Sequence, residues 1–312
     1  MTVNFTSINS TKANFDEIYV KNDPRSYFSV LGALDYMIPD VAAPVVRQIL
    51  MAYERRYRRR PVVLDVGSSY GINAAVHRFP VTFASLRRRY ARHEMTALEA
   101  DEVARLDRNY YASWPDTGTA SFVGLDASEQ AIRYALDVGL IERGIVADLE
   151  TAPLTDEAQD LVANVDIVLS TGAVGYVSEK TFGSIMASAS RPLWIVSFVL
   201  RMFPYDSLQR LFAKNGLVTE HLDSALFVQR RFSDIDEFER CLGELERRGL
   251  DSNGFESDGL LQADLFVSRP AADVERACLE DIVTISVGRN RPTGTRYVYV
   301  PTDEGQQVAL EP

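Results

Sequence analysis

Short apolar runs that end at a glycine or an acidic residue recur along the chain, and they constrain its fold more than any other feature. The first run, Val62–Val66, follows Pro61 and leads into a glycine turn, Gly67–Gly71. Short apolar runs bounded by turn residues are typical of buried strands in parallel sheets. The later runs are Ser121–Leu125, Gly144–Ala147, Val165–Leu169, Leu193–Leu200, Leu226–Val228 and Leu261–Val267.

Segments with helical spacing of apolar residues separate most of these runs. Helices are predicted from Ile72, over Ala131–Val138 with Gly139 as the stop, and over Asp206–Lys214. Strands that alternate with helices indicate an α/β fold, a doubly wound and mainly parallel sheet covered on both faces. We therefore expect seven strands in a Rossmann-like arrangement.

The length of 312 residues favours one large α/β domain with additional segments over two modest domains. Residues 1–60 are expected to form an N-terminal helical cover, with one helical stretch at Tyr27–Tyr57. Residues 61–270 would form the sheet domain. Residues 271–312 would be a C-terminal extension with one more helix and a strand at Tyr297–Val300.

Two insertions are expected within the sheet domain. In the first, at about 81–120, Thr96 and Glu99 have the spacing of a capping box. In the second, at 233–259, Ser233–Gly249 reads as a helix with a serine cap. Because this helix connects the last two predicted strands, we expect it to act as a lid beside the substrate.

The formal net charge of −11 should repel phosphate backbones and anionic lipid, so nucleic acid is a disfavoured partner. Two arginine clusters oppose this trend locally. Both are interpreted as solvated helix ends, and a patch for an anionic substrate or partner is the alternative. The clusters are Arg55, Arg56, Arg58, Arg59 and Arg60, and Arg87, Arg88 and Arg89.

The cysteine content and the apolar runs indicate a cytoplasmic protein. The two cysteines, Cys241 and Cys278, form no CxxC pair and have no zinc-ligand spacing. The segment Met1–Asp23 lacks the apolar core of a signal peptide, and Leu193–Leu200 is too short to span a bilayer. We expect no membrane association and no structural metal.

The residues that end each strand should carry the chemistry, because ligands of open α/β sheets bind outside the carboxyl ends of the strands. Gly67 and Gly71 allow a sharp turn and close approach of the backbone, with Asp65 beside the turn. Asp126 offers two acceptor oxygens suited to the hydroxyls of a ribose. Asp148 could accept a hydrogen bond from an adenine amine.

Four strand ends together resemble the class I S-adenosylmethionine-dependent methyltransferases in type and in order. They are the segments Asp65-Val66-Gly67-Ser68-Ser69-Tyr70-Gly71, Leu125-Asp126, Ala147-Asp148-Leu149 and Asp166-Ile167-Val168-Leu169-Ser170. The resemblance spans about Val62–Val267 and implies S-adenosylmethionine as the cofactor. It also implies that the glycine turn faces the methionine part, that Asp126 binds the ribose and that Asp148 binds the adenine amine. The implied cofactor-binding residues are Asp65, Gly67, Ser68, Gly71, Asp126, Ala127, Asp148, Leu149 and Ser170.

The chain departs from the family pattern at two points. Ser69 replaces the middle glycine of the turn, and the insertion lengthens the gap between the turn and Asp126. Ser69 also counts against a nicotinamide enzyme, whose G-x-G-x-x-G turn requires a glycine at that position.

Tyr176, Tyr70 and His221 are the candidate catalytic residues. Methyl transfer from a sulfonium requires positioning of the nucleophile, and a general base only where that nucleophile must lose a proton. Ser170–Tyr176 does not resemble the Asn-Pro-Pro-Tyr motif of amide and adenine nitrogen methylation. Three aromatic residues could cover the cofactor or pack in the core, namely Tyr27, Phe28 and Tyr36.

The resemblance and the acidic charge together predict a metal-independent methyltransferase that acts on a small molecule at oxygen, nitrogen or carbon. A protein or RNA methyltransferase is the first alternative, which the arginine clusters would favour if they lay on the same face as Gly67 and Asp126. A non-catalytic Rossmann-like binding protein is the second. The oligomeric state stays open, a homodimer included.

Overall fold

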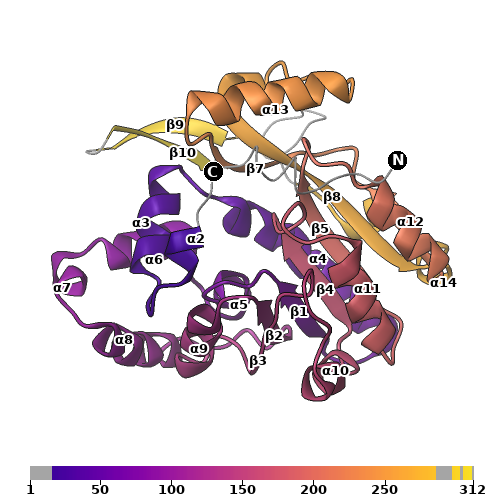
Figure 1. The fold of residues 1–312 in the computed structure, drawn as a ribbon, viewed down its shortest axis with the longest axis horizontal. Helices are drawn as coiled ribbons and strands as arrows, with labels where there is room; N and C mark the ends of the chain where they lie inside the picture. The colour runs from indigo at the N-terminus through magenta and orange to yellow at the C-terminus, as the bar shows by residue number, and fades with distance from the viewer. Residues whose placement is uncertain (1–15, 286–296, 303–304, 311–312) are drawn as a thin grey trace.

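The computed structural model describes residues 16–285, 297–302 and 305–310. Its main sheet has the order β3-β2-β1-β4-β5-β8-β6, and β7 pairs with β8 off this path. The first five strands are parallel, while β8 runs antiparallel to β5. This confirms the mainly parallel α/β fold (Figure 1). Six of its strands are β1 Val62–Val66, β2 Ser121–Asp126, β3 Arg143–Val146, β4 Ile167–Thr171, β5 Trp194–Leu200 and β8 Leu260–Pro270, with β3 at one edge.

Two short strands share the outer edge of β8. β6 (Leu217–His221) pairs with the second half of β8, and β7 (Phe227–Arg231) pairs with its first half. The sheet therefore has eight strands, and the expected count of seven is corrected by β6. The sequence pattern missed β6 because its only apolar residues are Leu217 and Val218, of which Val218 is exposed, so this edge strand contains no apolar run.

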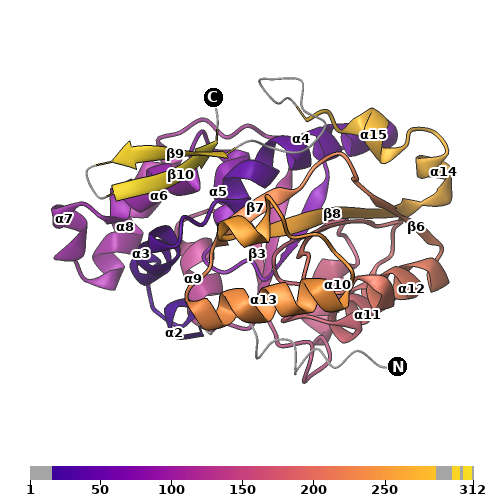
Figure 2. The ribbon, with the colours of Figure 1, turned by 90° about the horizontal axis from the view of Figure 1, so that it is seen from above.

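Helices cover both faces of the sheet, and successive residues of β1 point to opposite layers. Val63 contacts the core beneath α4, α5 and α9, whereas Leu64 contacts the core beneath α10, α11, α12 and α13. Figure 2 shows α4 on one side of the sheet and α11, α12 and α13 on the other. These helices are α4 Ile38–Tyr57, α5 Ile72–Arg78, α9 Glu129–Asp137, α10 Asp156–Val162, α11 Glu179–Ser188, α12 Asp206–Lys214 and α13 Ile235–Arg247.

The N-terminal cover and the first insertion pack together beside the sheet. The single predicted stretch Tyr27–Tyr57 is divided at residues 34–37 into α3 and α4. Helix α6 packs against α3, and α8 packs against α9. The elements of this region are α2 Asp16–Tyr19, α3 Arg25–Ala33, α6 Phe83–Tyr90, α7 His93–Thr96 and α8 Ala100–Ala112.

Two predicted helix caps are wrong by a few residues. Thr96 ends α7, and the capping box of α8 is formed by Glu99 with Glu102. The cap of α13 is Asp234, whose side chain accepts from the backbone N–H of Glu237, rather than Ser233. Helix α13 nevertheless lies where the spacing of apolar residues predicts it, and α8 lies within the first insertion, where a helix was expected.

The C-terminal extension contains more elements than predicted. Two short helices, α14 (Ala271–Val274) and α15 (Leu279–Ile282), replace the single expected helix. The predicted strand corresponds to β9 (Tyr297–Thr302), which forms a separate antiparallel pair with β10 (Gly305–Leu310). Within the described ranges, no single helix has the length and apolarity to cross a membrane; α3 and α4 meet that test only together, across a 100° bend.

Candidate functional site

A cavity of about 580 Å³ opens at the carboxyl ends of β1, β2, β3 and β4. Each of these strands contributes its terminal residues to the wall, and the N-terminal cover and β7 complete it. Among the predicted site residues, those that line the cavity are Gly67, Asp126, Ala127, Asp148, Leu149 and Tyr176. Five further lining residues were not predicted as site residues from the sequence: Tyr19, Asn73, Thr171, Gln229 and Arg230.

The turn after β1 brings the backbone to the cavity. Gly67 has φ +71°, and a Cβ there would lie 3.0 Å from the Cβ of Ala173. Ser69, which stands where the family pattern has a glycine, also adopts a left-handed conformation with φ +47°. The turn therefore keeps a glycine-like path, which costs about 1 kcal/mol for a residue with a Cβ.

Asp126 stabilises the left-handed conformation of Ser69 through a hydrogen bond. Its Oδ2 accepts from the backbone N–H of Ser69 at 2.8 Å, and its Oδ1 accepts from the N–H of Ser128 at 2.9 Å. Burial raises the pKa of this carboxyl and the two amides oppose that rise. Because each carboxylate oxygen has a second lone pair, both can still accept hydrogen bonds from a diol.

Asp148 and Leu149 form the part of the wall that β3 supplies. Asp148 is exposed, and its carboxylate accepts from the N–H of Glu150 at 3.1 Å and from Thr151 Oγ1 at 3.0 Å. Leu149 is buried beside it. An acidic acceptor next to an apolar surface suits a planar, amine-bearing ring such as adenine.

Asp65 lies behind the cavity wall and contacts it through Asn73. The side-chain amide of Asn73 donates to Asp65 Oδ1 at 2.8 Å and to Thr171 Oγ1 at 2.9 Å. Burial raises the pKa of Asp65 to about 7. Since the amide nitrogen is used by these two partners, the group that Asn73 offers to a ligand is its Oδ1.

Three other residues predicted to bind the cofactor lie outside the lining. Ser68 and Ser170 are buried, and at the end of β4 it is Thr171 that faces the cavity. Gly71 begins α5 with φ +81°, where a Cβ would approach Ala135 at 3.2 Å. These residues shape the turn and the strand end from behind.

Two of the three predicted catalytic residues do not reach the cavity, which corrects their expected placement. Tyr70 is buried, and its hydroxyl donates to the carbonyl oxygens of Ile18 at 2.9 Å and Lys21 at 2.8 Å. It thus fastens the N-terminal cover.

His221 lies on β6, at the far edge of the sheet. Its Nδ1 pairs with Asp223 at 2.6 Å, its Nε2 pairs with Asp264 at 3.2 Å, and its ring stacks on Phe266. The contact with Asp264 raises its pKa. Both ring nitrogens are therefore held by carboxylates outside the cavity.

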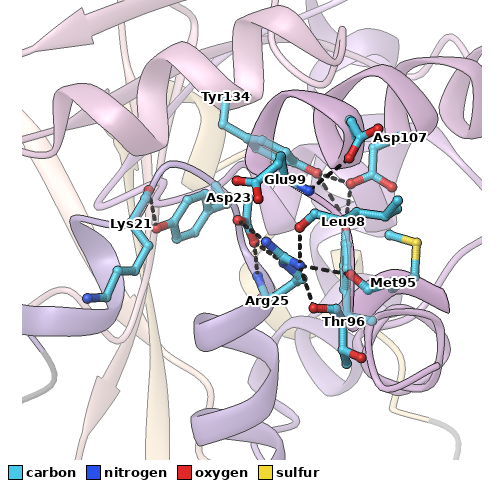
Figure 3. Close-up of polar contacts among 12 residues, drawn as sticks. Lys21, Asp23, Arg25, Met95, Thr96, Leu98, Glu99, Asp107 and Tyr134 are labelled. Atoms are coloured by element: carbon cyan, nitrogen blue, oxygen red, sulfur yellow. Dashed lines mark hydrogen bonds and ion pairs between the residues drawn. The ribbon is translucent and has the colours of Figure 1, made fainter. Parts of the chain in front are cut away.

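The N-terminal cover forms one side of the cavity. Tyr27 and Tyr36 line it as the covering role predicted, whereas Phe28 packs in the core against Tyr90 at 4.7 Å. The cover is also fastened at Arg25, which donates to the carbonyl oxygens of Met95 and Leu98, both at 2.8 Å. Figure 3 shows Arg25 directed at this part of the first insertion.

Helix α13 supports the cavity without lining it. Glu237 on α13 accepts two hydrogen bonds from Arg230, at 2.8 and 2.7 Å, and both side chains are buried. The helix therefore positions a residue of β7 at the site, although the sequence suggested a lid.

Arginines of both clusters form ion pairs with aspartates of the fold. Arg56 pairs with Asp273, and Arg59 pairs with the buried Asp166, at the C-terminal end of α4. That helix end leads into the amino end of β1. The first cluster therefore lies at the amino ends of the strands, whereas Gly67 lies at their carboxyl ends. In the second cluster, Arg89 pairs with the buried Asp107. Both clusters lie at helix ends, as predicted, but Arg59 and Arg89 bind buried carboxylates and are therefore not simply solvated.

The strand order and the cavity at the carboxyl ends give this chain the class I, Rossmann-like methyltransferase fold. No family model and no curated protein matches its sequence. The chain is similar to solved methyltransferase structures, among them the plantazolicin methyltransferase BpumL in complex with S-adenosylhomocysteine. That pair is 11% identical with a TM-score of 0.44, covering 85% of this chain and 97% of that one.

Two further solved structures are similar at the same level. A methyltransferase dependent on S-adenosylmethionine from Aquifex aeolicus is 11% identical with a TM-score of 0.36, covering 78% of this chain and 98% of that one. The O-methyltransferase of a trans-AT polyketide synthase multienzyme from Brevibacillus brevis is 10% identical with a TM-score of 0.37, covering 76% of each chain. Likeness this distant does not establish a substrate.

Proposed function

We propose that the protein is a methyltransferase that uses S-adenosylmethionine and acts on a small molecule. The observation that carries this proposal is the series of groups along one wall of the cavity: Asp148, Asp126 and the turn at Gly67. Their chemistry matches, in order, an adenine amine, a ribose diol and an amino acid chain. Bound there, the cofactor supplies an electrophilic methyl group on a sulfonium.

Different residues of the cavity would bind different parts of the cofactor. Asp126, held by two backbone amides, would accept from the ribose hydroxyls, and Leu149 would pack against the base. The Oδ1 of Asn73 and the backbone of the turn at Gly67 would hold the polar end of the methionine part. Fixing these ends aligns the methyl group with an acceptor in the remaining part of the cavity, which is the main source of rate in a displacement.

A cavity that the N-terminal cover lines on one side favours a small acceptor over a macromolecule. The tyrosines of the N-terminal cover lie over the cavity, and the first arginine cluster lies at the amino ends of the strands. An RNA substrate would be expected to meet basic side chains around the cavity mouth. RNA affinity that falls steeply with salt would favour the alternative of a macromolecular substrate.

The experiment is calorimetric titration with S-adenosylmethionine, S-adenosylhomocysteine and NAD. We expect micromolar binding of the two sulfur nucleotides and at least a tenfold loss in Asp126→Ala, about 1.4 kcal/mol. Asp116→Ala, which removes an exposed partner of Arg78 far from the cavity, is the matched control. Binding of NAD alone, or of none of the three, would refute the proposal. Retained binding without turnover on any acceptor would point to the non-catalytic alternative.

A further inference from the structure

The cavity extends beyond the part that the cofactor would fill. The residues that would bind the cofactor come from the ends of β1, β2 and β3, whereas Thr171 at the end of β4 and Gln229 and Arg230 of β7 line the cavity as well and would remain for the acceptor. We call this remaining part of the cavity the acceptor chamber. Its lining comprises Tyr19, Tyr27, Tyr36, Tyr176, Gln229 and Arg230.

Tyrosine rings dominate the chamber. The ring of Tyr27 lies 5.9 Å from that of Tyr19 and 6.4 Å from that of Tyr36. Burial raises the pKa of all three hydroxyls well above the usual value for tyrosine. The tyrosines are therefore neutral at physiological pH and are poor proton acceptors, while their ring faces attract cations.

The guanidinium of Arg230 does not make the chamber an anion site. Its two terminal nitrogens donate to both carboxylate oxygens of Glu237, and this buried ion pair has no net charge. Asp126, on the cofactor side of the same cavity, adds a negative charge. The resulting balance favours a positive or neutral ligand over a carboxylate or phosphate.

Gln229 presents an acceptor that lacks a partner within the described residues. Its side chain is only 3% exposed, and its Oε1 is buried without a hydrogen bond. The backbone is fixed, since its carbonyl oxygen accepts from the N–H of Met37 at 2.8 Å. The side-chain amide lies against the turn after β4, where a Cβ on Gly172 would approach its Nε2 at 2.2 Å. A buried acceptor left in this state costs about 1 to 3 kcal/mol, which a ligand donor would recover.

We propose that the methyl acceptor is an amine, and that one of its N–H groups donates to Gln229 Oε1 inside the ring of tyrosines. This inference rests on the proposed function and specifies its substrate class. An amine can donate one hydrogen to Gln229 and attack with its lone pair at the same time. A carboxylate, a thioether or a tertiary amine has no hydrogen to donate.

The displacement balances without a protein base. An aliphatic amine is protonated at physiological pH, as a lysine side chain is, so it first releases one proton to water. The lone pair of the resulting neutral amine forms the new N–C bond, and the C–S bond breaks with its electron pair returning to sulfur. The products are S-adenosylhomocysteine and an N-methylammonium ion, which then releases a proton to water. An aliphatic hydroxyl would have to lose its proton during attack, and the tyrosines of the chamber are too weakly basic to take it.

The test measures binding of matched probes to the protein saturated with S-adenosylhomocysteine. The probes are benzyl, cyclohexyl and butyl series, each as primary amine, alcohol and carboxylate. In at least one series we expect the amine to bind about tenfold more tightly than the carboxylate. Carboxylates that bind as tightly as the amines, or amines that fail to bind in every series, would overturn the inference.

Variants at Gln229 separate recognition from packing. Gln229→Leu should weaken amine binding about tenfold, whereas Gln229→Glu, which keeps the acceptor and adds a negative charge, should preserve or strengthen it. If both variants lose amine binding alike, Gln229 is structural and the inference fails. Gln262→Leu is the matched control, because Gln262 is a buried glutamine on β8 that pairs with Val228 and does not line the cavity.

One measurement distinguishes failure of this inference from failure of the proposed function. Binding of S-adenosylhomocysteine is determined first for the wild type and each variant. Loss of that binding in the wild type refutes the cofactor, whereas intact cofactor binding with the wrong probe preference refutes only the amine.

Discussion

Asn73 connects the buried carboxylate of Asp65, at 2.8 Å, to the hydroxyl of Thr171, at 2.9 Å, at the ends of two adjacent strands. Of these three residues, Asn73 and Thr171 line the cavity and Asp65 does not. Asp65 therefore acts as a positioning residue that fixes which way the Asn73 amide faces.

Asp65→Asn should change how stability depends on pH. Burial raises the folded-state pKa of Asp65 to about 7 from 3.8, so the fold favours the protonated acid. Its favourable contribution is fully present below about pH 4 and is lost as pH rises through 7. Asparagine carries no charge and can still accept from Asn73. Above pH 7 we expect the variant to be more stable by about 1 to 3 kcal/mol.

Urea denaturation at pH 5 and pH 8 measures this effect. The advantage of Asp65→Asn over the wild type should be larger at pH 8 than at pH 5. An equal difference at both pH values would show that Asp65 is not the titrating group.

Substitutions at Ser69 should report the left-handed turn. Ser69→Gly removes the unfavourable conformation but gains freedom in the unfolded chain, so its unfolding free energy should change by less than about 1 kcal/mol. Ser69→Val should cost about 1 to 2 kcal/mol and weaken binding of S-adenosylhomocysteine, because it displaces the amide that holds Asp126. Arg58→Val, at an exposed left-handed helix end, should lower stability without changing that affinity.

Tyr70→Phe should loosen the N-terminal cover. The variant loses the hydroxyl whose single hydrogen is shared between the carbonyl oxygens of Ile18 and Lys21, a contact worth about 1 kcal/mol in total. Hydrogen exchange of residues 18–25 should become faster, and the affinity for S-adenosylhomocysteine should fall severalfold. Tyr110→Phe, in the first insertion, is the control. Unchanged exchange over residues 18–25 would contradict the fastening role of Tyr70.

Glu237→Gln should lower stability more than most single substitutions on the face of the sheet that α10, α11, α12 and α13 cover. It leaves the buried guanidinium of Arg230 without its countercharge, which costs about 3 kcal/mol or more. The double variant Arg230→Met with Glu237→Leu should recover most of this loss in chemical denaturation. Additive losses in the double variant would show that the pair is not coupled.

The parallel core of the fold could be predicted from the sequence because its strands are continuous apolar runs. β1 and β5, for example, bury nearly every residue, and their ends mark the cavity. β6 could not be recognised, since an edge strand needs no apolar face on the solvent side. Cap positions were displaced by a few residues because several polar residues near a helix start compete for the same amides.

Site residues at the end of a single strand could be predicted from the sequence. Site residues that distant segments bring to the cavity could not. Asp126 is the last residue of β2, and Asp148 lies two residues after the end of β3. Gln229 and Tyr19 reach the cavity from β7 and from α2, and no local pattern signals that approach. Ser170 was predicted at the site, whereas Thr171 lines the cavity, because an unbroken apolar run does not indicate which side chains of β4 point to which face.

The residues that would bind the cofactor and those that would contact the acceptor come from different parts of one sheet. The residues that would recognise the cofactor come from β1 to β4, while Gln229 and Arg230 come from the hairpin of β7, α13 and β8. β8 is itself paired with β5 along Ala263–Ser268, whereas β7 contacts only the outer edge of β8 in the main sheet, so β7 can change its sequence without disturbing the parallel strands. Substitution within β7 alone would therefore be an economical route to new acceptors, in evolution and in the laboratory.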